Sequence, residues 1–428
     1  MPCPSCQQLT HPLRSGIIKY SKAIEKSDDL ELVRIYSADE RVETINRIYT
    51  ESFPVQERFG MDIIMRLADE GVLEVFAIMQ SGVTAGMLIT IVDDISAYIA
   101  YFAIDKAFRG QGLGSEVLSG ICSTYSGRQV VLEIELMDKN APNYEQRIRR
   151  EKFYTQRGFS HTGRFIRYSG VTYEIMFAGK QRFDKAAFDR LMDSRRDKEF
   201  QPLLFDAGHY STYIFDLDGT LLDTLDDLTA STNHAVTSVG YAPHSREEVC
   251  SYVGNGIEKL IRRALPEDVT QEVFEKAFAE FKAHYKLHCN DRTKAYSGIM
   301  ELLSTLKAHG KKVAVVSNKA DFAVKELCGE YFGGLADICV GEREGVRKKP
   351  APDSVLTVMD ELGSQPKDCL YIGDSDVDIA TAANAGIDCI SVLWGFRSER
   401  FLRQSGAAAL AQSPNEIAVF TLCDDNDR

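Results

Sequence analysis

The 428 residues of this chain are too many for one ordinary hydrophobic core, so we expect two or three domains. Acidic residues number 63 against 50 basic ones, and the net charge of -13 excludes a general attraction for nucleic acid or anionic membranes. The hydrophobic content of 44% is typical of a globular protein, and no apolar run approaches the roughly 20 residues that span a bilayer. We therefore expect a cytoplasmic protein with no membrane or nucleic-acid partner.

Residues 1–30 are polar and irregular, and we expect them to form an N-terminal tail. Within this tail, Cys3 and Cys6 make one CxxC pair, which is half of a zinc site. No second pair lies nearby to complete such a site. An irregular tail is therefore favoured over a metal or redox centre, and the role of the two cysteines stays open.

From residue 31 the sequence alternates between apolar runs and helical patterns, which predicts an α/β domain. Apolar runs at 72–79 and 83–91 flank Ser81-Gly82, which predicts a β-hairpin. The other expected elements are a strand at 32–36, a helix at 42–51, a strand at 95–104, a helix at 114–125, a strand at 130–137 and a helix that ends at Gly158. We place this domain at 31–178 and interpret the charge-dense stretch 179–209 as a linker that forms a linking helix or a hinge.

A glycine-rich turn connects the expected strand that ends at Ile104 with the helix that follows it. Glycines at the start of a helix let free N–H groups and the positive end of the helix dipole face an anion. The spacing fits neither the dinucleotide-binding fingerprint nor the P-loop. It resembles the pyrophosphate-binding loop of the GCN5-related N-acetyltransferases (GNAT), whose cofactor is acetyl-CoA. The loop residues are Arg109, Gly110, Gln111, Gly112, Leu113 and Gly114.

The GNAT resemblance covers about residues 31–178 and implies a mixed α/β sheet and further site residues. The strand along which this family binds the pantetheine arm would contribute Phe102, Ala103 and Ile104. Tyr154 stands where the family often has a tyrosine that protonates the departing thiolate, and its alternative is a packing aromatic. Glu133 is a candidate base for the amine acceptor. Glu135 competes for that role, and a solvated strand carboxylate is the other interpretation of Glu133. The acceptor amine itself is not implied.

The second block, 210–428, consists of short apolar runs separated by helices, which predicts a parallel, doubly wound sheet. The expected strands lie at 213–215, 313–316, 338–340, 369–372 and 389–392. A long helical stretch, about 224–295, separates the first strand from the second.

Polar residues follow four of these strands at once. Because ligands in open α/β sheets bind beyond the carboxyl ends of the strands, we expect these residues to converge. They are, in strand order, Asp216, Asp218 and Thr220, then Ser317 and Asn318, then Lys349, and then Asp374 and Asp378.

This set of residues suits the hydrolysis of a phosphate monoester. Mg²⁺ prefers oxygen ligands and would be held by Asp216, Asp374 and a carbonyl near Asp218, with Asp378 in support. A carboxylate beside such an ion can attack phosphorus and form an aspartyl phosphate. A second carboxylate two residues further on can protonate the leaving oxygen and later activate water.

The motifs DLDGT, Ser-Asn, Lys-Pro and GDSxxD resemble, in order, those of the haloacid dehalogenase-like (HAD) phosphatases across 210–425. The resemblance implies Asp216 as nucleophile and Asp218 as general acid and base. The dehalogenase branch lacks the second aspartate, so Asp218 favours phosphoryl transfer. The implied phosphate contacts are Thr220, Ser317, Asn318 and Lys349, and the implied metal residues are Asp216, Asp218, Asp374 and Asp378.

The helical stretch 224–295 fits a mobile cap that excludes water and sets specificity. Its Val253-Gly254-Asn255-Gly256 turn, with the preceding DLDGTLLDTLDDL, looks most like phosphoglycolate phosphatase. The glycines would let backbone amides approach an anionic substrate, and a plain turn between helices is the alternative interpretation. The segment 294–298 lacks the proline that this family usually has.

The leading hypothesis is therefore a bifunctional enzyme. An N-terminal N-acetyltransferase would use acetyl-CoA and an unknown amine, and a C-terminal Mg²⁺-dependent phosphatase would act on a small phosphorylated metabolite such as phosphoglycolate. Two alternatives stay open. The first block could be a non-catalytic acyl-CoA-binding regulatory domain, and the second could be a phosphomutase or a pyrophosphatase.

Overall fold

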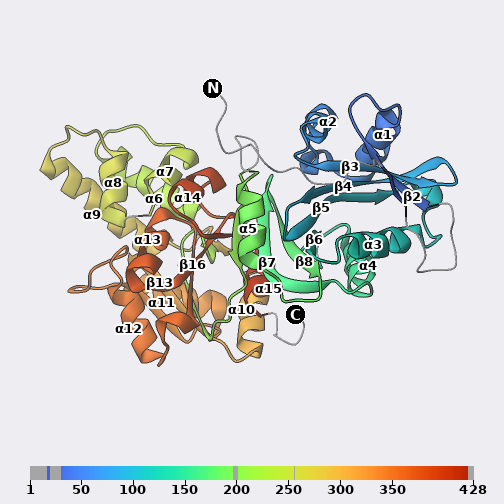
Figure 1. Cartoon of the computed structure of the whole chain (residues 1–428). Coiled ribbons are helices and arrows are strands. Elements are labelled where there is room, and N and C mark those ends of the chain that lie inside the picture. The colour runs from blue at the N-terminus through green and yellow to red at the C-terminus, as the bar shows by residue number, and fades with distance from the viewer. Residues whose placement is uncertain (1–16, 20–29, 140, 196–200, 255, 423–428) are drawn as a thin grey trace, which may run out of the picture. The chain divides into compact units, whose positions relative to one another are not determined.

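The computed structural model describes residues 17–19, 30–139, 141–195, 201–254 and 256–422. The chain forms two compact units that divide between Leu204 and Phe205 (Figure 1). Each unit has its own sheet and its own buried apolar clusters, as expected for a chain of this length. None of the helices in the described ranges is both long and apolar enough to cross a membrane.

The first unit is built on a mixed sheet with the strand order β1-β2-β3-β4-β5-β6-β8-β7. Its described strands pair antiparallel except for β5 and β6, which run parallel. The strands are β1 (Ile17–Lys19), β2 (Leu30–Ile35), β3 (Glu74–Gln80), β4 (Val83–Val92), β5 (Ser96–Ile104), β6 (Gln129–Glu135), β7 (Ser160–Tyr168) and β8 (Val171–Ala178). The helices are α1 (Val42–Ser52), α2 (Met61–Asp69), α3 (Leu113–Thr124), α4 (Tyr144–Thr155) and α5 (Lys185–Asp193), with the 3-10 turns η1 (Val55–Glu57) and η2 (Lys106–Phe108).

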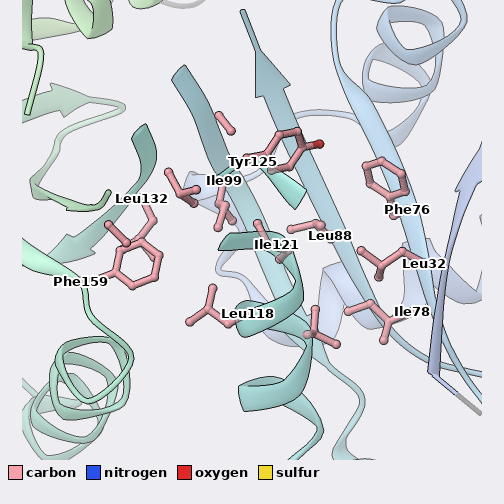
Figure 2. Close-up of a cluster of buried hydrophobic side chains, with 14 of the residues drawn as sticks. Leu32, Phe76, Ile78, Leu88, Ile99, Leu118, Ile121, Tyr125, Leu132 and Phe159 are labelled. Carbon is pink, nitrogen blue, oxygen red and sulfur yellow. The ribbon is translucent and has the colours of Figure 1, made fainter. Parts of the chain in front are cut away.

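Both faces of this sheet are covered by helices, which explains why its strands are apolar over long runs. On one face α3 packs Leu118 and Ile121 against Leu88, Ile99 and Leu132, as Figure 2 shows. On the other face the buried side chains of α1 and α2 pack against β3 and β4. The predicted hairpin is confirmed, since Ser81 (φ 50°) and Gly82 (φ 79°) form the left-handed turn between β3 and β4.

Two parts of the first unit differ from expectation at its amino end. β1 lies within the predicted irregular tail and pairs with β2 through Ile17↔Val33. Helix α2 was not predicted, although it buries Ile64, Met65 and Ala68. Cys3 and Cys6 lie outside the described residues.

The stretch predicted as a linker contains a helix that belongs to the core of the first unit. Phe188 and Leu191 of α5 are buried against Tyr98, Val131 and Ile166. The apolar side chains of α5 recur at helical spacing on one face, and the abundant charges between them concealed this pattern. The sequence predicted a linking helix or hinge in this stretch, and the structure has a helix at Lys185–Asp193 that also packs into the first unit. β9 (Leu203–Asp206) spans the division between the units.

The second unit has a six-stranded parallel sheet in the order β14-β13-β10-β15-β16-β17, which confirms the predicted doubly wound class. Its strands are β10 (Thr212–Phe215), β13 (Lys312–Ala320), β14 (Ile338–Glu342), β15 (Cys369–Gly373), β16 (Asp388–Val392) and β17 (Ala409–Ala411). Its sheet-flanking helices are α10 (Ile299–Ala308), α11 (Asp321–Phe332), α12 (Asp353–Glu361), α13 (Asp376–Ala385), α14 (Glu399–Gln404) and α15 (Pro414–Leu422), with η3 (Pro366–Asp368) before β15.

Between β10 and β13 the chain leaves the sheet to form a helical insert with an apolar core of its own. The insert consists of α6 (Leu225–Ser238), α7 (Arg246–Tyr252), α8 (Ile257–Ala264) and α9 (Gln271–His288). It begins and ends at a two-stranded ribbon of β11 (Leu222–Asp223) and β12 (Lys294–Ala295). Buried Asp227 fixes the returning chain, because its carboxylate accepts hydrogen bonds from the backbone N–H groups of Arg292 and Thr293.

Replacing Phe188 by alanine tests whether α5 stabilises the first unit. Loss of this fully buried ring should cost about 3–5 kcal/mol of unfolding free energy. Urea unfolding followed by far-UV circular dichroism should show an earlier transition. The fluorescence of Trp394, the one tryptophan of the chain, reports the second unit separately.

The matched control is Lys180→Ala, because Lys180 is exposed beside the same helix and should change stability by less than about 0.5 kcal/mol. An unchanged unfolding midpoint for Phe188→Ala would show that α5 is a linker after all.

Candidate active sites

Three buried carboxylates meet at the carboxyl end of the parallel sheet. Asp216 follows β10, and Asp374 and Asp378 follow the neighbouring strand β15. One carboxylate oxygen of each lies within 4.8 Å of the others. Oxygen ligands at this spacing suit a hard divalent cation such as Mg²⁺. The predicted convergence of these three residues is observed in the structure.

A buried ammonium group connects two of these carboxylates. Lys349 Nζ lies 2.7 Å from Asp216 Oδ1 and 2.8 Å from Asp378 Oδ1, and it also donates to the Tyr371 hydroxyl at 3.0 Å. Burial disfavours the charged form of Lys349, but the two carboxylates outweigh this effect and raise its pKa well above the usual range. Lys349 therefore carries its positive charge at the centre of the site.

The raised pKa values of two carboxyl groups indicate that the site has too little positive charge to balance its carboxylates. Burial raises the pKa of Asp216 to about 7, although the Lys349 ammonium opposes the rise. Burial, followed by repulsion from Asp378 and Asp216, raises the pKa of Asp374 well above its usual range. A divalent cation would favour the charged form of each carboxylate and lower both pKa values. The residues present thus fit a metal ion.

Asp374 is held in place by backbone that comes very close to it. Its Oδ2 atom accepts a hydrogen bond from the Phe396 backbone N–H at 2.6 Å. A Cβ atom at Gly219 would lie 2.4 Å from Asp374 Oδ2, and one at Gly395 would lie 2.3 Å from Asp374 Cβ. Only glycine fits at these two positions while the carboxylate stays where it is.

The Asp218 side chain is engaged elsewhere. Its Oδ1 atom accepts hydrogen bonds from Lys319 Nζ at 2.8 Å and from Thr224 Oγ1 at 2.7 Å. Lys319 also donates to the hydroxyl of Tyr285, which belongs to α9 of the helical insert. Among the described residues, the carboxylates that can share one ion do not include Asp218. The Asp218 carboxylate thus lies outside the metal cluster, and the metal contact expected from a carbonyl near Asp218 stays a prediction.

The predicted phosphate contacts divide into those that reach the cavity and one that does not. A cavity of about 70 Å³ is lined by Ser317, Asn318 and Lys349. Asn318 also fixes the backbone of Lys349, whose N–H donates to Asn318 Oδ1 at 2.9 Å. Thr220 is fully buried outside this lining, and its carbonyl accepts a hydrogen bond from Trp394 Nε1 at 2.9 Å. The Thr220 side chain thus does not line the cavity, and this geometry gives no support to its predicted phosphate contact.

The structure adds cavity residues that the sequence did not single out as functional. Arg397 lines the cavity and donates to the backbone carbonyls of Cys250 at 2.9 Å and Val253 at 2.6 Å in the helical insert. Because Arg397 follows the strand β16, the rule that located the other strand-end residues would also have found it. Tyr285 offers no sequence signal, since its position depends on how the insert packs.

In the first unit a cavity forms where β5 and β6 separate. Their parallel pairing ends at Tyr98↔Val131, although both strands continue. Beyond that point lies a cavity of about 500 Å³. Of the predicted cofactor residues, those that line it are Phe102, Ala103, Ile104 and Arg109. Unpaired backbone groups on two diverging strands can bind an extended amide-containing ligand.

The predicted glycine-rich loop lies at the start of α3. Gly110 (φ 78°) and Gly112 (φ 85°) adopt left-handed conformations with open space around them, and α3 begins at Leu113. The loop thus leaves the first N–H groups of the helix accessible to an anion. The remaining residues of the loop make contacts within the protein. Leu113 is buried in the core, Gln111 donates to the Ala107 carbonyl, and Gly114 lies next to Phe153.

The structure separates the two candidate bases. Glu135 is paired with Arg150 and accepts a hydrogen bond from Asn143 at 2.8 Å. In contrast, Glu133 Oε1 accepts hydrogen bonds from the hydroxyls of Tyr98 and Tyr168, and its Oε2 atom is buried without a partner. Glu133 is therefore the carboxylate that is free to take up a proton.

Burial raises the pKa of Glu133 to about 7. The hydroxyls of Tyr98 and Tyr168 oppose this rise, and repulsion from Glu57 adds to it. A carboxylate with such a pKa is suited to proton transfer near neutral pH. Tyr154 on α4 also lines the cavity, where its ring packs against Phe159.

Comparisons with known proteins identify a family for each unit. The family model for haloacid dehalogenase-like hydrolases matches residues 213–392. Phosphoglycolate phosphatase 1 of Pseudomonas aeruginosa is 34% identical over 44% of this chain and 71% of its own length. This chain belongs to the haloacid dehalogenase-like hydrolase family. The model of the acetyltransferase (GNAT) family matches residues 42–159, so the hydrolase carries a GNAT domain in its first unit.

Further relatives cover the same half of the chain. Phosphoglycolate phosphatase of Aquifex aeolicus is 35% identical over 43% of this chain and 84% of its own length. A solved structure from Lactobacillus delbrueckii subsp. bulgaricus is 36% identical, with a TM-score of 0.49, and covers 50% of this chain and 99% of its own.

Gly219→Ala tests the close packing around Asp374. The new Cβ atom would displace the carboxylate, and a shift of this size at an active site typically lowers turnover about 100-fold. The measurement is hydrolysis of p-nitrophenyl phosphate by the purified hydrolase. Gly240→Ala is the matched control, because Gly240 has a similar φ of 90° but open space around it, so only backbone strain changes. Equal losses in both variants would contradict the packing argument.

Proposed function

We propose that the protein is a bifunctional enzyme, with an acetyl-CoA-dependent N-acetyltransferase in the first unit and a Mg²⁺-dependent phosphatase in the second. The observation that carries the phosphatase is the buried cluster of Asp216, Asp374, Asp378 and Lys349 beside Asp218. The observation that carries the acetyltransferase is the cavity between the diverging strands β5 and β6, which opens beside a glycine-rich helix start.

In the phosphatase, Asp216 attacks the phosphorus atom and forms an aspartyl phosphate. Asp218, oriented by Lys319 and Thr224, donates a proton to the leaving oxygen and then removes one from the attacking water. Lys349 and Ser317 stabilise the charge on the phosphoryl oxygens. Asp216, Asp374 and Asp378 would hold the metal ion. When bound, the ion supplies the charge neutralisation that lets a phosphate dianion approach carboxylates.

The substrate of this site is a small phosphate monoester, and phosphoglycolate is the favoured one. Relatives named as phosphoglycolate phosphatases cover this unit. The cavity of about 70 Å³ is small, and Arg397 places a second positive charge in it, as a carboxylate-bearing substrate would need. Gly254 and Gly256 lie at the cavity wall, where backbone can approach an anion closely.

In the acetyltransferase, the backbone of β5 and the start of α3 would hold acetyl-CoA, with Arg109 at the cavity wall. Glu133 accepts the proton of the attacking amine, and Tyr154 protonates the departing thiolate. Tyr154 lines the same cavity as Glu133. Burial raises the pKa of Tyr154, so it stays protonated and able to donate near neutral pH.

Asp216→Asn tests the nucleophile. The variant keeps the shape of the side chain but loses the charged oxygen, so phosphate release from p-nitrophenyl phosphate and phosphoglycolate should fall at least about 1,000-fold. Wild-type activity should likewise disappear with a chelator and return with added Mg²⁺. The control is Asp360→Asn on the exposed end of α12, which should retain full activity.

Turnover by folded Asp216→Asn at the wild-type rate would overturn the nucleophile assignment. Activity that survives chelation would overturn the metal requirement. A phosphomutase would produce an isomer of a phosphorylated sugar without release of phosphate, and a pyrophosphatase would prefer pyrophosphate over phosphoglycolate.

The pH dependence of acetyl transfer tests Glu133. Because its pKa is raised to about 7, the carboxyl is mostly protonated below that pH and cannot act as a base. The rate should therefore rise with pH through about 7 and level off above it. Glu133→Gln should remove this rise and lower the rate about 100-fold or more, measured by release of the CoA thiol. A non-catalytic CoA-binding domain would instead bind CoA and show no transfer that depends on Glu133 or Tyr154.

A further inference from the structure

The cavity of the first unit has an acidic and aromatic wall that binding of acetyl-CoA does not explain. The four carboxylates that line it are those of Glu51, Glu57, Glu133 and Glu135. Tyrosine rings complete this wall, among them those of Tyr101, Tyr168 and Tyr173. CoA is itself an anion, so this wall is poorly suited to its phosphates and must serve the other substrate.

Two of these carboxylates are already neutralised by basic side chains. Glu135 pairs with Arg150, and Glu51 lies 3.5 Å from Arg47 and 3.6 Å from Lys106. Their charges are balanced within the protein, so neither carboxylate needs a ligand.

The other two, Glu57 and Glu133, have no ion-pair partner among the described residues. Burial raises the pKa of both carboxyls. Repulsion from Glu135 adds to the rise at Glu57, where the charges of Arg150 and Arg147 oppose it, and repulsion from Glu57 adds to the rise at Glu133. Glu133 Oε2 is in addition buried without any hydrogen-bond partner. A buried carboxylate without an ion-pair partner is costly, and a second carboxylate beside it adds to that cost, so this cavity wall favours the binding of cations.

Tyrosine rings line the space beside the two carboxylates. Tyr173 interacts with the Glu57 side chain and stacks on Tyr168 with 5.2 Å between the ring centres, and Tyr168 donates to Glu133 Oε1 at 2.8 Å. Tyr101 fixes the position of Glu57, because its hydroxyl donates to the Glu57 backbone carbonyl at 2.7 Å. Aromatic faces attract ammonium groups and also pack against the methylene groups between them.

We propose that the acetyl acceptor is a linear diamine or polyamine whose distal ammonium pairs with Glu57 while its reacting amine lies at Glu133. This inference rests on the proposed acetyl transfer and names its substrate class. A second cationic group is required because the reacting amine loses its charge during the reaction and could not hold the acceptor at Glu57. The cavity of about 500 Å³ has room for both ends.

Side chains of the cavity accept and donate the protons that the reaction requires. The amine nitrogen forms a bond to the acetyl carbonyl carbon, and the bond from that carbon to the CoA sulfur breaks. Glu133 takes the proton from nitrogen, and Tyr154 gives a proton to the thiolate. The products are the monoacetylated diamine and CoA, and the distal ammonium remains paired with Glu57 throughout.

Three acceptors of similar length isolate the charge at the far end: 1,4-diaminobutane (positive), pentylamine (neutral) and 4-aminobutanoate (negative). With acetyl-CoA and the full chain, kcat/KM should be at least about tenfold higher for the diamine than for pentylamine, and lowest for 4-aminobutanoate. Glu57→Gln should abolish the preference for the diamine, so that the ratio of its kcat/KM to that of pentylamine falls to about one; the ratio is compared because Glu57 also raises the pKa of Glu133 and so affects every acceptor. The matched control is Glu43→Gln, because Glu43 is exposed on α1 and does not line the cavity.

Binding of 1,4-diaminobutane, measured by calorimetry without acetyl-CoA, separates this inference from the proposed function. Binding that depends on Glu57, without any release of CoA, would support the acceptor site and overturn acetyl transfer. Efficient transfer to pentylamine or 4-aminobutanoate, with no preference for the diamine, would support acetyl transfer and overturn the acceptor class. An equal loss with all three acceptors in Glu57→Gln would also overturn it, and so would the absence of diamine binding.

Discussion

The second unit depends on one buried ammonium group. Three carboxylates cannot be buried together at the ends of adjacent strands without positive charge, because each unpaired ion costs several kcal/mol to remove from water. Lys349, with only 4% of its side chain exposed, pairs with Asp216 and Asp378 at once. Asn318 in turn holds the Lys349 backbone through two hydrogen bonds. The loop after β14 is therefore tied to Asp216 at the end of β10.

The first unit solves a similar electrostatic problem in the opposite way. Glu57 and Glu133 face a cavity and form no ion pair among the described residues, although the charges of Arg150 and Arg147 attract the Glu57 carboxylate. In the second unit the protein provides the cation for a phosphate substrate, whereas here the arrangement leaves the cation to be supplied by a ligand. The same physical cost of burying charge thus points to an anionic substrate in one unit and a cationic one in the other.

Sequence patterns predicted most of the phosphatase site because parallel strands bring their carboxyl ends to one edge, so a polar residue after each strand is informative on its own. Asp216, Asp374 and Lys349 were located in this way. The partners of Asp218 were not, because Lys319 meets Tyr285 only after the helical insert has folded over the sheet. The position of the Thr220 side chain was not predictable either, because the local backbone decides where a hydroxyl within a motif points. Here the side chain is buried and does not line the cavity. In α5, frequent charges hid a regular apolar face.

The strand order of the second unit also determines when its parts can fold. The central strand β10 pairs with β13 through Thr212↔Lys312 and with β15 through Thr212↔Cys369, so both of its neighbours come much later in the chain. During synthesis β10 therefore cannot pair until these later strands have been made, while the helical insert can already form contacts among its own helices. The first unit pairs mainly strands that are adjacent in sequence and lies entirely upstream. We therefore expect the GNAT domain to fold during translation, before the sheet of the hydrolase half can form.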